Sequence, residues 1–93
     1  MLLYEWDTDK AATNLEKHGV SFADASTVFL DPLAATWPDP DHSVSEFRFI
    51  TIGQSSNGEV LFVAHQELAD DRVRLISARK ATRRERHAYQ EGL

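Results

Sequence analysis

Residues 47–67, FRFITIGQSSNGEVLFVAHQE, decide the fold of this chain. The segments 47–54 and 59–67 are rich in β-branched and aromatic residues, and Ser55-Ser56-Asn57-Gly58 lies between them. Asn-Gly between two such segments is the strongest short-range signal of a β-hairpin. We therefore predict two antiparallel strands joined by a two-residue Asn57-Gly58 turn.

The predicted hairpin would align charged side chains across the sheet. With a two-residue turn the numbers of paired residues sum to 115, so that Arg48 lies opposite Glu67. If Asp70-Asp71 is a second two-residue turn, Glu67 pairs onward with Arg74. Arg48, Glu67 and Arg74 would then form one row over three strands, with His65 on the same face. A shift of one residue would scatter these side chains to opposite faces, so the row depends on the register.

This row has a functional and a structural interpretation. RNA is cleaved without a metal when its 2′-hydroxyl attacks the adjacent phosphate, which requires a base, an acid and cations around the phosphorane-like charge. Arginine suits the cationic task because its guanidinium donates to two phosphate oxygens in parallel. Glu67 or His65 would serve as the base, and histidine has the better unperturbed pKa. The alternative is a solvated Arg–Glu–Arg ladder in which each pair contributes about 0.2–1 kcal/mol.

The N-terminal third predicts two short helices. Asp7 or Thr8 caps the first, and Gly19 is its C-terminal stop. Ser21 resembles the start of a capping box for the second, which ends at Asp31-Pro32. Such short helices are not stable alone, so they must pack against other elements.

Further signals complete the fold. Short strands are predicted at 2–6, 33–37 and 72–78, and Thr82 with Glu85 forms a capping box for a last helix. We therefore predict a single α+β domain over residues 1–93. It would contain two N-terminal helices, an antiparallel meander of three to four strands and a C-terminal helix.

The positive charges gather in one segment, although the net charge is −5. Residues 1–71 hold 13 acidic residues and three Lys or Arg, whereas residues 72–86 hold seven Lys or Arg and one Glu. This asymmetry favours a phosphate-bearing or acidic partner, with a solvated basic helix as the alternative. Because the rest of the chain is acidic, it is not expected to coat nucleic acid non-specifically. Candidate RNA-binding residues in the basic segment are Lys80, Arg83 and Arg84.

No metal or cofactor is expected. The chain has no cysteine, which excludes disulfides, thiolate metal sites and cysteine nucleophiles. Histidines at positions 18, 42, 65 and 87 have no zinc-motif spacing, and no glycine-rich phosphate loop is present. The longest apolar run, 60–64, is too short to span a bilayer, and residues 1–9 lack the basic start of a signal peptide. We expect a soluble, cytoplasmic protein with no membrane partner.

Several short motifs follow one another along the chain. They are Trp6-Asp7, Lys10-Ala11, Asn14, Glu16-Lys17-His18-Gly19-Val20-Ser21-Phe22, Ala25, Val28-Phe29, Asp31-Pro32, Arg48-Phe49-Ile50-Thr51-Ile52-Gly53, Ile76-Ser77-Ala78-Arg79-Lys80-Ala81, Arg84-Glu85-Arg86 and Tyr89. In this order they resemble the BrnT toxins of bacterial type II toxin–antitoxin modules. The resemblance runs from end to end without a large insertion.

The resemblance implies a fold and a function. It implies a RelE-like toxin fold and a metal-independent endoribonuclease that inhibits translation and growth. It also implies a cognate, BrnA-like antitoxin of the ribbon-helix-helix type. The toxin would then bind operator DNA only through this antitoxin. The family's site positions correspond best to Arg48 and Arg79, with Lys17, His18, Glu67 and Arg74 as further candidates.

Two features depart from the family pattern. Many relatives carry Thr-Glu-Arg at the end of the second long strand, where this chain reads Gln66-Glu67-Leu68. In a straight third strand Arg79 falls on the opposite face from Arg74. Only a bulge or a strand end near Ser77 would bring the two arginines together.

The sequence leaves two functions open. As a ribonuclease, the chain would use Arg48, Arg74 and Arg79 on the phosphate and Glu67 or His65 for protons. As a non-catalytic binding module, its basic C-terminal segment would dock an acidic partner helix or operator DNA. RNA cleavage that survives metal chelation distinguishes the two.

Overall fold

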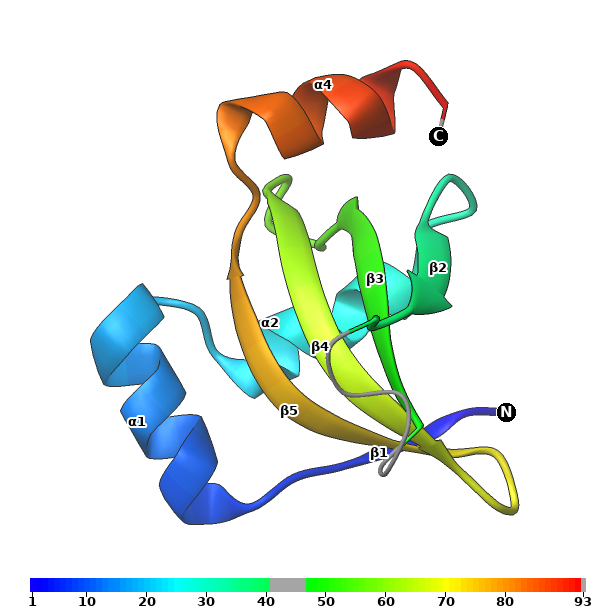
Figure 1. Ribbon diagram of the computed structural model, residues 1–93. Coiled ribbons are helices and arrows are strands. Elements are labelled where there is room, and N and C mark those ends of the chain that lie inside the picture. Colours follow the sequence, from blue (N-terminus) through cyan, green and yellow to red (C-terminus); the bar gives the residue numbers. More distant parts are fainter. Residues whose placement is uncertain (41–46, 93) are drawn as a thin grey trace.

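The computed structural model describes residues 1–40 and 47–92. Within these residues, five strands form one sheet in the order β1-β5-β4-β3-β2 (Figure 1). The strands are β1 (Leu3–Glu5), β2 (Ala35–Pro38), β3 (Arg48–Gln54), β4 (Val60–Leu68) and β5 (Arg72–Lys80). Strands β2 to β5 form an antiparallel meander, and β1 joins it in parallel beside β5.

The α-helices of the described residues begin at predicted N-cap residues, and the first of them also ends at the predicted Gly19. The helical elements are α1 (Thr8–His18), α2 (Phe22–Ser26), the 3-10 helix η1 (Thr27–Leu30) and α4 (Arg83–Gln90). The Asp7 side chain accepts hydrogen bonds from two N–H groups of the first turn of α1, and Gly19 ends this helix with a φ of 71°. Thr82 and Glu85 form the reciprocal capping box of α4.

The α+β class, the C-terminal helix and an antiparallel meander, which has four strands, are confirmed. Within the described residues the sheet gains a fifth strand, β1, in parallel, so it is mixed and not an antiparallel meander alone. The N-terminal strand pairs with β5 in parallel because the helical segment carries the chain across the sheet before the meander begins. The second helix is also shorter than predicted, since it continues from Thr27 as a 3-10 helix.

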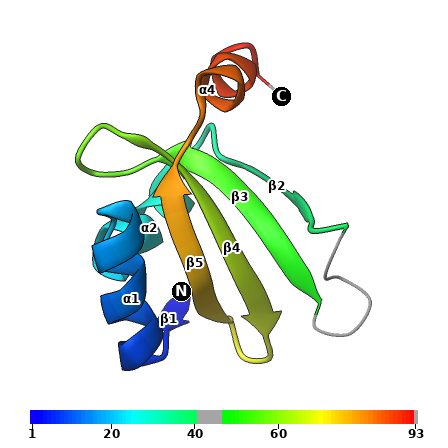
Figure 2. The ribbon, with the colours of Figure 1, turned by 60° about the vertical axis from the view of Figure 1, so that its left-hand side comes forward.

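One face of the sheet carries the core. Helix α2 and η1 lie against this face, and α1 lies along β5 (Figures 1 and 2). We call this the helix face and the opposite side the outer face. The buried side chains of the core are Val20, Phe22, Ala25, Val28, Leu61, Val63, Val73, Leu75 and Ala78.

A side chain closes the edge of β5 beyond β1. Strand β1 pairs only with residues 72–74, so Ala78 has no strand beside it on that side within the described residues. Asn14 of α1 takes that place. Its Oδ1 accepts from the Ala78 N–H (3.1 Å), and its Nδ2 donates to the carbonyls of Ala78 (2.9 Å) and Val20 (3.0 Å). Since Asn14 is only 7% exposed, these bonds fix α1 to β5 away from water.

The β3–β4 hairpin differs from the prediction by one residue. Arg48 pairs with Gln66, so paired numbers sum to 114. The Ser55 N–H donates to the Glu59 carbonyl (2.8 Å), and the Gly58 N–H donates to the Ser55 carbonyl (2.9 Å). With Gly58 at a φ of 83°, this is a three-residue loop with glycine in the left-handed position, the other common loop for such a sequence.

The β4–β5 hairpin is offset too, but only over its first half. Residues 69–71 form the turn, where Asp70-Asp71 adopt φ values of 62° and 59°. Arg74 therefore lies opposite Gln66. The pairing then shifts by one position because β5 carries an extra residue, Ile76, which forms a β-bulge. Beyond the bulge the pairing follows the predicted register.

Candidate functional site

The two offsets change the predicted row of charges. Arg48, Gln66 and Arg74 lie side by side on β3, β4 and β5, and Glu5 of β1 continues the row beside Arg74. The predicted Arg48–Glu67–Arg74 row is wrong because both loops contain three residues. Since both offsets shift β4 by the same single position relative to its neighbours, the two arginines still share a face.

The bulge at Ile76 brings Arg79 to this face as well. Without the extra residue, the alternation of side chains along β5 would place Arg79 and Arg74 on opposite faces of the sheet. With it, Arg79 pairs with Phe62 on the outer face, on the same side as Arg74. The expected condition for uniting these arginines, a bulge near Ser77, is therefore met. We call the set Arg48, Gln66, Arg74, Ser77 and Arg79 the arginine face.

Glu5 pairs with the arginines at one end of the arginine face. Its Oε1 accepts from Arg72 Nη1 (3.1 Å), and its Oε2 accepts from Arg74 Nη2 (2.9 Å) and Nε (3.2 Å). These interactions, the hydrogen bond from Arg74 foremost, lower the pKa of Glu5. The Arg74 side chain remains 51% exposed, so an anion in solvent can reach it.

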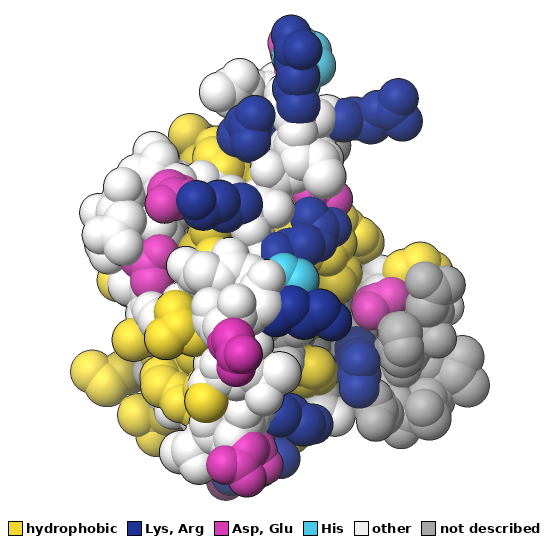
Figure 3. All heavy atoms as spheres, turned by 90° about the vertical axis from the view of Figure 1, so that its left-hand side faces the viewer, with side chains coloured by type: hydrophobic (Ala, Val, Ile, Leu, Met, Phe, Trp, Pro, Cys, Tyr) yellow, Lys and Arg dark blue, Asp and Glu magenta, His cyan; other side chains and the backbone are white. Residues whose placement is uncertain are grey.

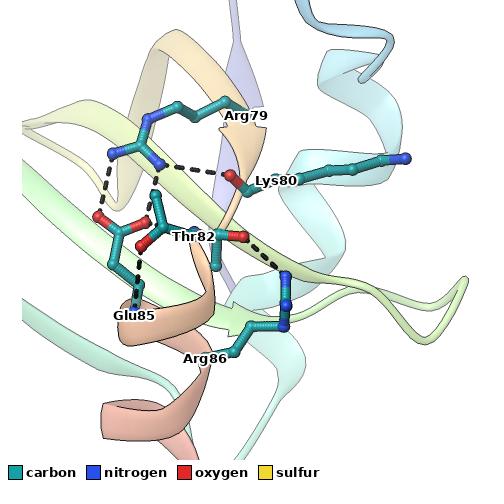
Figure 4. Close-up of polar contacts among 6 residues, drawn as sticks. Arg79, Lys80, Thr82, Glu85 and Arg86 are labelled. Carbon is teal, nitrogen blue, oxygen red and sulfur yellow. Dashed lines mark hydrogen bonds and ion pairs between the residues drawn. The ribbon is translucent and has the colours of Figure 1, made fainter.

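Arg79 is oriented by two neighbours at the other end. Its Nη1 and Nη2 donate to Glu85 Oε1 (2.8 Å) and Oε2 (3.0 Å), and its guanidinium lies 4.0 Å from the centroid of the Phe62 ring. Glu85 also accepts from the Thr82 N–H at the start of α4 (Figure 4). The bonds from Arg79 foremost lower the pKa of Glu85. Arg79 thus ties α4 to β5, a structural role, and still exposes 36% of its side chain.

His65 lies in the core and not on the arginine face. It is 1% exposed, and its Nε2 is hydrogen-bonded to Thr51 Oγ1 (2.7 Å), which in turn meets Thr36 Oγ1 (2.7 Å). The Phe29 and Phe49 rings pack against the imidazole. Burial lowers the pKa of His65 to about 4, so the ring is neutral at pH 7. The prediction that His65 shares a face with the arginines is wrong.

This buried imidazole makes stability sensitive to acid. The pKa of His65 is about 4 in the folded state and 6.5 for an ordinary histidine, so the unfolded state binds more protons between these values. The free energy of unfolding therefore falls as the pH falls from 6.5 to 4, by about 3 kcal/mol in total. Urea unfolding across this pH range measures the loss.

Two variants separate His65 from the other titrating groups. His65→Gln should remove most of the pH dependence of the unfolding free energy in the upper part of that range. At those pH values the carboxylates stay ionised, so they do not contribute to the dependence. His87→Gln changes a side chain that is 74% exposed and should keep the dependence. A wild-type unfolding free energy that stays constant over the range would show that the imidazole is not buried and neutral.

Glu67 also lies away from the arginine face. It pairs with Val73 on the side of the helix face, and it is exposed at the end of β4. There it lines a hollow of about 200 Å³ together with Phe29 and Leu2. Neither of the two bases predicted from the sequence therefore lies on the arginine face.

Lys17 and His18, at the end of α1, adjoin the arginine face. Both line a hollow of about 320 Å³ between α1 and β5, and Ser77 forms part of its opposite wall. Figure 3 views this side of the molecule and shows a band of Lys and Arg side chains with a histidine among them. Their last-turn position also favours positive charge through the helix dipole, which is the structural alternative.

The other predicted RNA-binding residues divide between two places. Arg83 and Arg84 lie on α4, where they line a basic hollow with Arg86. Lys80 is paired with Glu59 (3.4 Å) at the far end of the β4–β5 hairpin. Arg83 and Arg84 therefore extend the basic surface beyond Arg79, whereas Lys80 does not belong to the arginine face.

Among the described residues, no group of three or more His, Asp or Glu side chains could hold a metal ion. The histidine at position 42 lies outside the described residues. No helix in residues 1–40 or 47–92 is long and apolar enough to cross a membrane.

Two residues that support the site, Asp31 and Tyr89, were not predicted from the sequence to do so. Asp31 accepts from the N–H groups of Gln54 (2.8 Å) and Leu33 (2.9 Å) and from the hydroxyl of Tyr89, which holds the end of α4. Partial burial opposes the ionisation of Asp31, but these bonds outweigh it and lower its pKa. The bond to Asp31 foremost raises the pKa of Tyr89 to about 12. Asp31 and Tyr89 belong to the family resemblance, which was the available signal.

Fold and site together define a small α+β protein that gathers arginines on an open sheet face. A family model described as the ribonuclease toxin BrnT of type II toxin–antitoxin systems matches residues 6–85. The chain therefore belongs to the BrnT family of ribonuclease toxins, as the sequence resemblance predicted.

The fold is similar to a solved member of that family. The crystal structure of the Brucella abortus ribonuclease toxin BrnT superposes with a TM-score of 0.70 at 25% sequence identity. The match covers 89% of this chain and 100% of that one. Comparison with curated proteins gives no match.

Proposed function

We propose that this toxin cleaves RNA internally on the arginine face and needs no metal ion for the reaction. The common face of Arg48, Arg74 and Arg79, assembled by two offset loops and one bulge, carries this proposal. Guanidinium groups bind phosphate oxygens in a bidentate manner and stay charged throughout the physiological pH range. The exposed parts of Arg74 and Arg79 allow a strand of RNA to approach them.

The proposed reaction is a transesterification within the RNA strand. The 2′-oxygen bonds to the adjacent phosphorus and the bond from phosphorus to the 5′-oxygen breaks, which leaves a 2′,3′-cyclic phosphate and a 5′-hydroxyl. A base removes the 2′-hydroxyl proton, and an acid supplies a proton to the leaving oxygen. The arginines stabilise the negative charge that grows on the non-bridging oxygens in the transition state.

His18 is the proton-transfer group in this proposal, in place of the buried His65. It lines the hollow that adjoins Ser77 of the arginine face, and Lys17 beside it adds a cation. Histidine is the side chain whose ordinary pKa suits proton transfer near neutral pH. Arg83 and Arg84 would bind the flanking phosphates along α4.

The antitoxin in this proposal is a BrnA-like, ribbon-helix-helix protein that covers the arginine face and α4. The concentration of Lys and Arg in residues 72–86 favours an acidic segment as the neutralising element. Operator DNA is then bound only through the antitoxin, and the complex acts in the cytoplasm. The same surface serves RNA and antitoxin, so the two compete.

Expression of the chain with and without the neighbouring antitoxin gene tests this function. We expect growth arrest and loss of cellular RNA from the toxin alone, and recovery when the antitoxin is co-expressed. Arg48→Ala should abolish the arrest while the protein still accumulates. Normal growth in the presence of folded, antitoxin-free wild-type toxin would contradict the proposal and favour a non-catalytic binding module.

A further inference from the structure

A groove lies between α4 and the outer face of the sheet, beside the arginine face. It holds about 440 Å³, and its floor is formed by the apolar side chains of Trp37, Ile52 and Phe62. Arg84 and Glu85 form part of its α4 wall. None of the roles proposed above uses Trp37 or the apolar floor.

The aromatic rings give this groove a definite shape. The Trp37 and Phe62 ring centroids are 6.4 Å apart, and the ring planes meet at 75°. A flat molecule that stacks on one of these rings therefore meets the other with its edge. Ile52, only 2% exposed, closes the floor between them. The groove thus offers aromatic rings on which a planar group can pack.

The groove begins where the arginine face ends. Phe62 and Glu85 line the groove, and both also contact Arg79, one through its ring and one through a bidentate ion pair. A group bound in the groove is therefore an immediate neighbour of an anion bound at Arg79. Within a nucleotide, a flat base and a phosphate have this relation.

We propose that the groove binds an unstacked base of single-stranded RNA whose neighbouring phosphate lies against Arg79, an inference that rests on the ribonuclease function proposed above. Proteins recognise single-stranded RNA by stacking its splayed bases on aromatic side chains. Trp37 is then a specificity-determining residue, and the groove decides which nucleotide is held beside the cut.

Binding of uncleavable RNA tests this role without requiring cleavage. Short 2′-O-methyl oligonucleotides are compared intact and with an abasic unit at each position in turn. We expect one abasic position to weaken binding to the wild type by about tenfold, the effect typical of losing one stacked base. Trp37→Ala should weaken binding of the intact strand by a similar factor and show no further loss at that position.

Two further variants show whether a loss of binding comes from the groove or from misfolding of the protein. Ala88→Phe fills the groove from α4 without removing a sheet residue, so it should reproduce the binding defect even if Trp37→Ala fails to fold. Leu30→Ala truncates an apolar side chain that is 79% exposed outside the groove, and it should bind like the wild type.

Three results would overturn the assignment of this groove to a base. The first is equal binding of all abasic strands by the wild type. The second is an unchanged dependence on the base in both groove variants. The third is weakened antitoxin binding with unchanged RNA binding, which would assign the groove to the protein partner. Failure of the ribonuclease function is seen separately, as intact unmodified RNA despite base-dependent binding.

Discussion

Replacing Arg79 with alanine should lower the rate of RNA cleavage by about a hundredfold or more, the usual cost of removing one donor that stabilises transition-state charge. Arg79 is held in place by the Glu85 carboxylate and the Phe62 ring, so its guanidinium needs little reorganisation to meet a phosphate. The measurement is the initial rate of cleavage of a labelled single-stranded RNA by the purified, antitoxin-free protein.

A second variant separates catalysis from the tie between β5 and α4. Glu85→Gln breaks the same ion pair but keeps the guanidinium. Because the pair is partly exposed, we expect both variants to lose about 1 kcal/mol or less of unfolding free energy. Only Arg79→Ala should lose most of the cleavage rate. Equal losses of cleavage in the two variants would reduce Arg79 to a structural residue.

Asn14→Ala should destabilise the fold more than any surface substitution on α1. The side chain makes three buried hydrogen bonds, and its removal leaves the Ala78 N–H and carbonyl and the Val20 carbonyl without these partners. Buried backbone groups that lose a partner cost about 1–3 kcal/mol each, so we expect a total loss of at least about 3 kcal/mol. For a domain of this size that corresponds to a fall in Tm of roughly 12–24 °C.

Glu16→Ala is the matched control for this prediction. It lies two residues farther along α1 on an exposed position, so its unfolding free energy should stay within about 0.5 kcal/mol of the wild type. Thermal and urea unfolding of both variants make the comparison. A loss below about 1 kcal/mol in Asn14→Ala would show that the edge of β5 does not depend on this amide.

The features that could be predicted from the sequence depend on local contacts. The capping of α1 by Asp7 and the capping box of Thr82 with Glu85 each join groups two or three residues apart, and both are present. The parallel strand β1 was not predictable in this way, because its partner β5 lies at the other end of the chain. Local signals do not say which distant strand an N-terminal strand joins.

The register of the two hairpins could not be predicted, because packing against the rest of the fold decides which register has the lower free energy. Asn-Gly permits loops of two or three residues, and the choice moves every β4 side chain to the other face relative to β3. The three-residue loop places Thr51 and Val63 together in the core, with His65 next to them against Phe29. The sequence therefore predicted arginines that share the outer face, but it placed His65 and Glu67 on the wrong face.

The most direct test is the cleavage of RNA by purified, antitoxin-free toxin in excess EDTA, with analysis of the new 3′ ends. We expect cleavage to continue, to leave 2′,3′-cyclic phosphates, and to disappear in a strand that lacks 2′-hydroxyls. Arg74→Ala should lower the rate while leaving the type of end unchanged. Cleavage that stops on chelation, or that leaves 3′-hydroxyl ends, would contradict a metal-independent reaction on the arginine face.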